Sequence, residues 1–295
     1  MSIDVEDWCQ STFDRNAPIT SRVYDNTMRL LELLARRKTT ATFFVLGLVA
    51  EKFPRLIQEI YGQGHEIASH GYSHQPIFKQ SRQEFTLDVQ RSLELLESLT
   101  GCKILGYRAP DFSINSTTLW ALEVLQELNL LYDSSIFPVH NPRYGIPDWP
   151  RPPLPVDGNG GKRLIEFPIS TLRLGCVNIP FIGGGHTRLW PAWFIAWGIR
   201  RLHREGLPAM IYMHPYEINP DEFDALEVKI PFKQKFHQGL NRRTVYGKTE
   251  RLLEKFRFGP IRDVLTVQKL LPDPSIMKDK TPTSDFQISL RPHRG

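Results

Sequence analysis

Short, mostly apolar runs of strand length alternate with amphipathic helical patterns along most of the chain, and this alternation limits the folds that are open to it. The run Ala41–Leu46 fits a strand that is buried on both faces, and Val49–Tyr61 then carries apolar residues at helical spacing. Further strands are predicted at Ser2–Val5, His65–Ser69, Ile104–Tyr107, Leu131–Ser134, Leu164–Pro168 and Ala209–His214. Strands alternating with helices predict an α/β fold of repeated βα units, with a parallel sheet or a barrel.

The helical segments carry recognisable start and stop signals. Gly62 ends the helix predicted at Val49–Tyr61, and Ser81 with Glu84 forms a capping-box pattern before a long helix. The stretch Phe137–Gly161 is rich in proline and glycine and is predicted to be a long loop. Other helices are predicted at Tyr24–Arg37, Ser116–Leu128, Pro191–Arg204 and Lys248–Phe256.

The composition excludes several classes of protein. The 295 residues are 41% hydrophobic and 23% charged, which is ordinary for a globular chain. The net charge of +5 comes without a compact basic run of the nucleic-acid type. The excess of positive charge therefore indicates either a solvated basic face or attraction to an anionic polymer or membrane surface. Three separated cysteines form no CxxC pair, so we expect neither a disulfide framework nor a cysteine metal site.

Membrane and targeting segments are not expected from the sequence. No apolar run reaches the roughly 18 residues of a transmembrane helix. The N-terminal residues show no basic segment followed by an apolar one, so we expect no secretory signal. A cytoplasmic location follows as an expectation, with association to the envelope left open.

Three carboxylates, Asp4, Glu6 and Asp7, lie within four positions at the end of the first predicted strand. They repel one another, and without a cation one or more would be driven toward protonation. Because side chains alternate along a strand, Asp4 and Glu6 share one face, and Asp7 joins them if the chain turns after Glu6. The pattern fits a cation site or, alternatively, a solvated strand end.

His70 and His74 follow the third predicted strand at a spacing of four residues. In one helical turn this spacing places both imidazoles on the same side, where they can hold one ion. The residues between them are Gly71, Tyr72 and Ser73, which excludes the mechanism of HExxH enzymes with glutamate as base. The pair therefore indicates a metal site of another type, or two neighbouring histidines without a ligand role.

Two further polar residues follow predicted strands. Arg108 follows Ile104–Tyr107, where its guanidinium could hold a carboxylate in fixed geometry, and Pro110 stiffens the loop beyond it. His214 ends the last predicted strand and can act as a general acid near neutral pH. A surface arginine and a core histidine are the alternatives. Because the carboxyl ends of parallel strands meet on one rim, we expect all four clusters to converge there.

The order and spacing of these clusters resemble those of NodB-type polysaccharide deacetylases, carbohydrate esterase family 4, and most of all the branch associated with exopolysaccharide loci of the exosortase type. The resemblance covers about residues 1–260. The matching stretches are SIDVEDW at 2–8, TFFVLG at 42–47, GHEIASHGYSH at 64–74, GYRAPDFSI at 106–114, YDSSIFP at 132–138 and MHPYEI at 213–218.

The resemblance implies a distorted (β/α) barrel, often with seven strands rather than eight. Residues 1–271 would form one domain, with a C-terminal extension from about residue 220. Residues 272–295 are polar and rich in proline and lysine, and they are predicted to form a disordered tail.

A divalent metal, commonly zinc, is also implied by the resemblance, bound by two histidines and one carboxylate. His70 and His74 match the two histidines. The common family motif has two adjacent aspartates, whereas this chain has Asp-Val-Glu-Asp at positions 4–7. Glu6 is therefore the implied carboxylate ligand, and Asp7 stays an alternative.

The catalytic residues carry over in the same way. Asp4 matches the catalytic base, Arg108 the arginine that orients this base, and His214 the general acid. A general acid of this kind needs an acidic partner to stay protonated, and the sequence does not choose among its candidates, which are Asp133, Glu166 and Glu217.

The implied activity is removal of N-acetyl groups from an amino-sugar polysaccharide or oligosaccharide, with release of acetate. Pro110, Phe112 and Tyr72 are expected to bind the substrate. Other aromatic residues near the motifs that could stack on sugar rings are Trp8, Tyr144 and Trp149. Two rival functions stay open, namely a metal-dependent hydrolase of a small cyclic amide on the same scaffold and a non-catalytic carbohydrate-binding protein.

Overall fold

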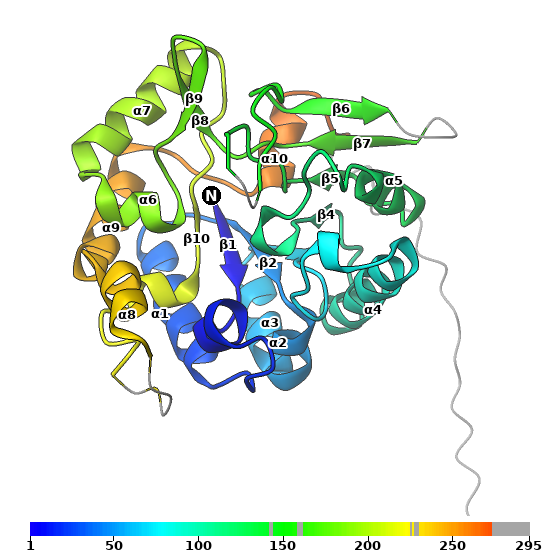
Figure 1. Ribbon diagram of the computed structural model, residues 1–295, viewed down its shortest axis with the longest axis horizontal. Helices are drawn as coiled ribbons and strands as arrows, with labels where there is room; N and C mark the ends of the chain where they lie inside the picture. Colours follow the sequence, from blue (N-terminus) through cyan, green and yellow to red (C-terminus); the bar gives the residue numbers. More distant parts are fainter. Residues whose placement is uncertain (142–143, 158–161, 225, 227–229, 273–295) are drawn as a thin grey trace, which may run out of the picture.

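One curled, mostly parallel sheet organises the protein in the computed structural model, which describes residues 1–141, 144–157, 162–224, 226 and 230–272. The strand order is β10-β1-β2-β3-β4-β5-β7-β6, and every pairing is parallel except that of β6 with β7. The strands are β1 (Ser2–Val5), β2 (Thr42–Val45), β3 (Glu66–Ser69), β4 (Gly106–Tyr107), β5 (Tyr132–Asp133), β6 (Leu154–Asp157), β7 (Arg163–Glu166) and β10 (Tyr212–Met213). Seven parallel strands and an antiparallel edge strand form the expected distorted (β/α) barrel (Figure 1).

Helices surround this sheet, and a small hairpin stands beside it (Figure 1). The helices that follow the first strands are α1 (Arg22–Arg36), α2 (Gly47–Lys52), α3 (Pro54–Gly62), α4 (Arg82–Thr100) and α5 (Trp120–Glu127). The later helices are α6 (Gly184–Leu189), α7 (Ala192–Arg204), α8 (Phe232–Gly239), α9 (Val245–Lys255) and α10 (Ile261–Val267). The hairpin consists of β8 (Thr171–Leu174) and β9 (Val177–Pro180). Within the described residues, no helix is long and apolar enough to cross a membrane.

The two-residue alternation of the strands separates two apolar cores. Ile3 and Val5 of β1 belong to the large core under the outer helices, whereas Asp4 between them faces the barrel interior with Phe44 of β2. The interior core is smaller, and α10 packs into it through Ile261 and Leu265. Polar side chains on the inward positions are therefore surrounded by the barrel wall.

The predicted helix at Val49–Tyr61 is wrong in one respect, because the structure divides it into α2 and α3. Phe53 leaves helical geometry with φ −129° and ψ 62°, and Pro54 then starts α3. A proline lacks an N–H and disfavours helical geometry in the residue before it, so the break is dictated locally. The capping box at Ser81 and Glu84 is confirmed at the start of α4.

The second half of the chain holds elements that the pattern analysis did not predict. The stretch Phe137–Gly161, predicted as a loop, contains β6. The hairpin β8–β9 and the helices α8 and α10 were also not predicted, because their short segments lack a long apolar period. The tail predicted for residues 272–295 lies almost wholly outside the described residues.

A pair of buried carboxyl groups joins β5 to β7 on the outer side of the sheet. Asp133 and Glu166 are register partners, and neither is exposed to solvent. Asp133 accepts hydrogen bonds from the backbone N–H and the hydroxyl of Ser135, and Glu166 accepts one from the N–H of Ile136. Burial raises the pKa of both carboxyl groups, and the charge of Asp133 adds to the rise at Glu166.

Because its pKa is raised in the folded state, Glu166 contributes stability at low pH that is lost as pH rises through the folded-state value. We expect Glu166→Gln to remove this dependence. The slope of the unfolding free energy against pH should then become less negative by up to about 1.4 kcal/mol per pH unit above the ordinary glutamate pKa of about 4.3. Urea denaturation at a series of pH values measures this slope. If the unfolding free energy of the variant and of the unaltered protein changed with pH in the same way, the raised pKa of Glu166 would be contradicted.

Candidate active site

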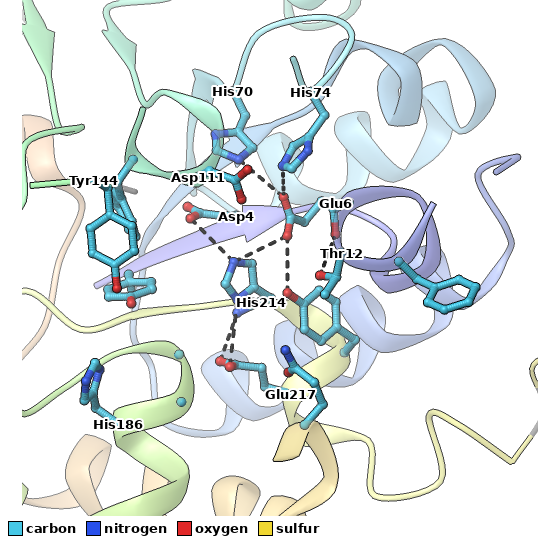
Figure 2. A pocket seen from close by; sticks show the side chains of 18 of the residues that line it. Asp4, Glu6, Thr12, His70, His74, Asp111, Tyr144, His186, His214 and Glu217 are labelled. Carbon is cyan, nitrogen blue, oxygen red and sulfur yellow. Dashed lines mark hydrogen bonds and ion pairs between the residues drawn. The ribbon is translucent and has the colours of Figure 1, made fainter. Parts of the chain in front are cut away.

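A pocket of about 470 Å³ opens at the carboxyl ends of the parallel strands and collects most of the polar clusters that the sequence singles out. Its walls include Asp4 and Glu6 at the end of β1, His70 and His74 after β3, and His214 after β10. Figure 2 shows these side chains pointing toward one another, although they come from opposite ends of the chain. The expected convergence at one rim is therefore found.

Glu6, His70 and His74 could hold a metal ion. Their ligand atoms lie within 4.8 Å of one another, and all three residues are buried. The Glu6 carboxylate is 2.6 Å from Nε2 of His74 and 3.4 Å from Nε2 of His70. Burial alone would raise the pKa of Glu6, but the charges of His74 and His214 hold it well below its usual range. Two imidazoles and one carboxylate form a donor set that suits a catalytic divalent cation.

The hydrogen-bond partners of His70 and His74 differ in which ring nitrogen they allow to carry the proton. Nδ1 of His70 lies 2.8 Å from the carbonyl of Arg108, which can only accept a hydrogen bond, so Nδ1 carries the proton and Nε2 keeps a free lone pair. Nδ1 of His74 instead faces the guanidinium of Arg15 at 3.0 Å, which can only donate. Arg15 also donates to the carbonyl of His74 and, at 2.5 Å, to the carboxylate of Asp111. Ligation through Nε2 of His74 would place its proton on Nδ1, facing the Arg15 guanidinium.

The segment between the histidines is not a helical turn, so that part of the sequence argument is wrong. Gly71 and His74 have φ values of 74° and 60°, and a tight turn replaces the helix. Asp88 of α4 stabilises this turn by accepting hydrogen bonds from the N–H groups of Tyr72 and Ser73. The imidazole rings nevertheless meet, with their centroids 5.4 Å apart.

Asp7 does not join the group. One of its carboxylate oxygens accepts a hydrogen bond from the N–H of Cys9, and the other accepts two from Thr20. Its side chain thereby links two parts of the segment that follows β1, and it does not bind the histidines. Of the two carboxylates that the sequence left open, the geometry favours Glu6.

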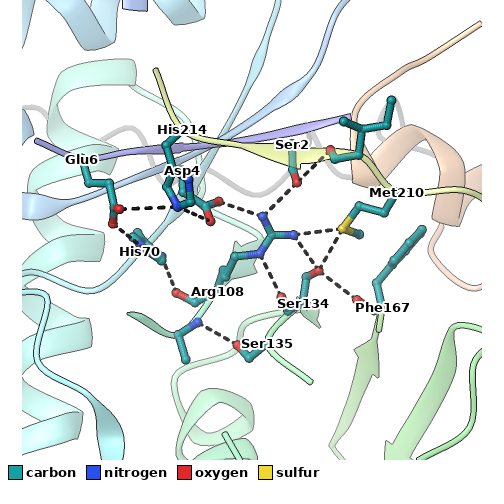
Figure 3. A network of polar contacts seen from close by, with 12 residues as sticks. Ser2, Asp4, Glu6, His70, Arg108, Ser134, Ser135, Phe167, Met210 and His214 are labelled. Carbon is teal, nitrogen blue, oxygen red and sulfur yellow. Dashed lines mark hydrogen bonds and ion pairs between the residues drawn. The ribbon is translucent and has the colours of Figure 1, made fainter. Parts of the chain in front are cut away.

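Arg108 crosses the barrel interior and holds Asp4 (Figure 3). Its exposed fraction is 0%, and it donates to Oδ1 of Asp4 at 2.7 Å. Its remaining N–H groups bind the hydroxyl of Ser2, the carbonyl and hydroxyl of Ser134, and the sulfur of Met210. The guanidinium also lies over the ring of Phe44 at 4.1 Å. With all five N–H groups engaged, Arg108 fixes the carboxylate of Asp4 in one orientation.

His214 faces carboxylates on both sides. Its Nε2 lies 3.4 Å from Glu6 and 3.9 Å from Asp4, and its Nδ1 lies 3.9 Å from Glu217. Burial alone would lower the pKa of His214, but the charges of Glu6 and Glu217 outweigh burial and raise the pKa to about 9. Glu217 is itself held by Arg188 of α6 at 3.2 Å.

Among the three candidate partners of His214, the structure selects Glu217. Asp133 and Glu166 pair with each other on the outer face of the sheet, away from this pocket. Glu217 follows His214 by three residues in a short 3-10 helix, Pro215–Ile218, and also accepts a hydrogen bond from the N–H of His214.

The residues expected to bind substrate are only partly brought together. Phe112 lines the pocket, and so does Tyr144, one of the aromatic residues considered for sugar stacking. Tyr72 is buried and binds Glu51 through its hydroxyl, outside the pocket lining. Pro110 is also buried behind the lining, and Trp8 packs against Phe223. Trp149 does not reach the pocket either.

Several pocket residues were missed by the sequence analysis. Arg15 lies in the segment after β1, Asp111 in the loop after β4, and Arg188 and His186 in α6. Asp111 belongs to the recognised GYRAPDFSI stretch but was given no role, whereas Arg15, His186 and Arg188 lie outside the recognised stretches, so no local signal identified them. The Tyr216 hydroxyl, 3.3 Å from Glu6, belongs to the recognised MHPYEI stretch but was given no role.

Two family models match the chain. The polysaccharide deacetylase family matches residues 6–130, and a domain of unknown function (DUF3473) matches residues 134–266. The first region contains Glu6, both histidines and Arg108, whereas His214 and Glu217 lie in the second.

Curated relatives share part of the chain. A peptidoglycan-N-acetylglucosamine deacetylase of Bacillus cereus is 36% identical over 98 residues, which are 33% of this chain and 36% of that protein. A peptidoglycan deacetylase of Helicobacter pylori is 36% identical over 114 residues, 38% of this chain and 37% of that one. A chitooligosaccharide deacetylase of Sinorhizobium fredii is 29% identical over 158 residues, covering 51% and 63%. The matched part thus spans about a third of the length of the first two relatives.

Solved structures share the fold over most of the chain. A proposed polysaccharide deacetylase of Mycobacterium smegmatis superposes with a TM-score of 0.61 at 22% identity, covering 92% of this chain and 91% of that one. PuuE allantoinase superposes with a TM-score of 0.59 at 14% identity, covering 90% and 87%. At such identities the likeness concerns the fold alone. Residues 6–130 of this chain thus match the polysaccharide deacetylase family, and the barrel around them shares the fold of the solved structures named above.

Proposed function

We propose that the protein is a divalent-metal-dependent hydrolase that removes N-acetyl groups from an amino-sugar polysaccharide and releases acetate. The observation that carries this proposal is that three groups meet in one pocket. They are Asp4, which Arg108 holds, the possible metal ligands Glu6, His70 and His74, and His214, which lies between carboxylates. The names of the curated relatives, which are deacetylases of peptidoglycan or chitooligosaccharide, support the same reaction and substrate class.

The donor set fits a zinc ion or a similar divalent cation. Glu6, His70 and His74 would hold it, and the carbonyl of Arg108 keeps Nε2 of His70 available as a ligand. When bound, such a cation supplies Lewis acidity, which lowers the pKa of water and polarises a carbonyl group. The same donor types suit zinc, cobalt and manganese, and we propose zinc as the most common occupant of such sites.

Asp4 is placed to accept the proton of the attacking water. Arg108 holds its Oδ1 at 2.7 Å, which leaves Oδ2 directed toward the pocket and His214. The water oxygen forms a bond to the carbon of the acetyl amide, and the carbon–nitrogen bond then breaks. Asp4 lies on β1, and His214 directly follows the neighbouring strand β10. Their proton-transferring atoms are 3.9 Å apart, so Asp4 can serve the water and His214 the nitrogen at one substrate carbon.

His214 is placed to protonate the leaving nitrogen. A pKa of about 9 keeps the imidazole protonated at neutral pH, as a proton donor requires. A bound cation would offset the charge of Glu6, and Glu217, held by Arg188, would then be the carboxylate that sustains this state. Transfer of the proton from Nε2 to nitrogen yields the free amino sugar and acetate.

The pocket also bears on the rival functions. Because the fold match with PuuE allantoinase is as good as that with the M. smegmatis protein, fold alone does not separate a polysaccharide substrate from a small cyclic amide. The retention of Asp4, Arg108 and His214 argues against a non-catalytic binding protein. Acetate release from a panel of N-acetylated oligosaccharides, with and without chelator, is the deciding assay. Hydrolysis of a cyclic amide without acetate release would overturn the proposal.

The assignment of the carboxylate ligand is tested by a matched pair of variants. We expect Glu6→Gln to lower zinc affinity by more than about 100-fold, a larger loss than the removal of an outer-shell partner causes. Asp7→Asn should retain zinc binding, because Asp7 serves Cys9 and Thr20 instead. Calorimetric titration of the chelator-treated protein with zinc measures both. If Asp7→Asn lost zinc and Glu6→Gln kept it, the two roles would have to be exchanged.

The role of His214 is tested by its loss. His214→Ala should bind zinc as the unaltered protein does, while kcat for acetate release falls by about 100- to 10,000-fold. His203→Ala, which removes an exposed histidine of α7, serves as the control and should turn over normally. Normal turnover by His214→Ala would rule out its role as the acid.

The role of Glu217 is tested through pH dependence. Glu217 raises the pKa of His214, and activity that needs the proton of His214 should decline as pH rises through this raised pKa. Glu217→Gln removes one stabilising charge and should move this decline to lower pH by roughly one unit. The pH profile of kcat measures the shift, and an unmoved profile would assign the protonated state to another neighbour.

A further inference from the structure

The outward face of α7 carries an aromatic surface that the proposed chemistry does not use. Trp193, Phe194 and Trp197 recur at helical spacing on α7, and Trp190 directly follows α6; we call these four residues the tryptophan stripe. Trp193 is 69% exposed, and Trp190 and Trp197 are each 37% exposed. The opposite face of α7 is buried in the large core. Phe194 also packs against this core, whereas the three tryptophans are additional to the residues that hold the helix in place.

The stripe is continuous and has apolar neighbours. Phe194 lies at its centre, with its ring centroid 4.7 Å from that of Trp190 and 5.5 Å from that of Trp197. The hairpin β8–β9 stands beside α7 (Figure 1), tied to it by a hydrogen bond from Arg201 to the carbonyl of Arg173. Near the hairpin turn, Leu174 and Val177 are 47% and 56% exposed. Apolar surface gathered in this way marks an interaction site.

The charges on α7 itself are of one sign, and the carboxylate of Glu205, directly after the helix, pairs with Arg201 and Arg151. The segment 186–204 contains four arginines and no aspartate, glutamate, asparagine or glutamine. Arg200 and Arg204 are exposed in the last turns of α7. Among the residues that the structure describes, no carboxylate forms an ion pair with either of them. Two cations without an ion pair among the described residues thus lie at one end of an exposed aromatic face, with the guanidinium of Arg200 over the ring of Phe256.

We propose that the tryptophan stripe, with Arg200 and Arg204, binds the surface of an anionic lipid bilayer. Tryptophan rings favour the level of the lipid headgroups, and arginines are attracted to anionic headgroups. A helix with aromatic residues and arginines on its outer face is typical of proteins that lie in this interface. A polysaccharide is disfavoured as the occupant, because the segment offers no carboxylate or amide side chain to hydrogen-bond sugar hydroxyls.

The surface begins where the pocket ends. Leu189, at the end of α6, lines the pocket, is 56% exposed and directly precedes Trp190. Binding through the stripe would hold the mouth of the pocket beside the bilayer, where a membrane-attached glycan would be within reach. This last point rests on the proposed function, whereas lipid binding itself does not.

The test is co-sedimentation of the full chain with two kinds of vesicles, phosphatidylcholine alone and phosphatidylcholine mixed with phosphatidylglycerol. We expect preferential binding to the anionic vesicles. Trp193→Gln should weaken the apparent affinity about tenfold. The double variant Arg200→Glu/Arg204→Glu should weaken it by at least about 25-fold, since each basic residue near an anionic surface contributes about fivefold.

Leu87→Gln provides the matched control, because Leu87 is 59% exposed on α4, at the opposite side of the barrel in Figure 1. It should bind as the unaltered protein does, and thermal melting followed by circular dichroism should show that all variants fold. Three results would overturn the proposal. The first is that the unaltered protein does not bind vesicles, and the second is that all variants bind them equally well. The third is that Trp193→Gln weakens self-association or oligosaccharide binding but leaves vesicle binding unchanged.

Discussion

The structure depends on a buried guanidinium. Arg108 lies inside the barrel with no exposed surface, and a charge in such a place is tolerated only when it is paired and every N–H finds an acceptor. Asp4 supplies the opposite charge, and Ser2, Ser134 and Met210 supply the remaining acceptors from other strands and loops. The same contacts that make the burial possible also join β1 to the far side of the barrel. Stability and the orientation of the proposed base therefore rest on one network.

Strand alternation explains how the pocket acquires its polar walls. A one-residue shift in β1 would exchange Asp4 with its apolar neighbours Ile3 and Val5 and bring carboxylates into the outer core. The large apolar core under the helices thus fixes the register, and the register in turn directs Asp4 inward. Beyond the strand ends, the geometry of the turns determines where the side chains point, as in the segment from His70 to His74.

Much of the first half of the fold and the outline of the site could be predicted, because long apolar periods and strand-end clusters are local signals. The confirmed features include the parallel strands and the meeting of the clusters at one rim. The sequence did not predict local geometry that depends on a single residue or on a partner distant in the chain. Pro54 breaks a helix whose apolar spacing runs through it, and His74 reaches its place with a positive φ. The choice of Glu217 as partner of His214 needed the structure, since only the fold shows that the other carboxyl groups face away.

The pairing of β1 with β10 has a consequence for how the chain folds during synthesis. The backbone N–H of Ser2 donates to the carbonyl of Ile211, so β1 completes its second edge only after about 210 further residues are made. At ribosomal rates this interval is roughly 10 to 40 s. Throughout it, one edge of β1 can pair with other chains, which exposes the nascent protein to aggregation. Residues from distant parts of the chain therefore complete one sheet, and we expect strand pairing of such high sequence separation to close slowly.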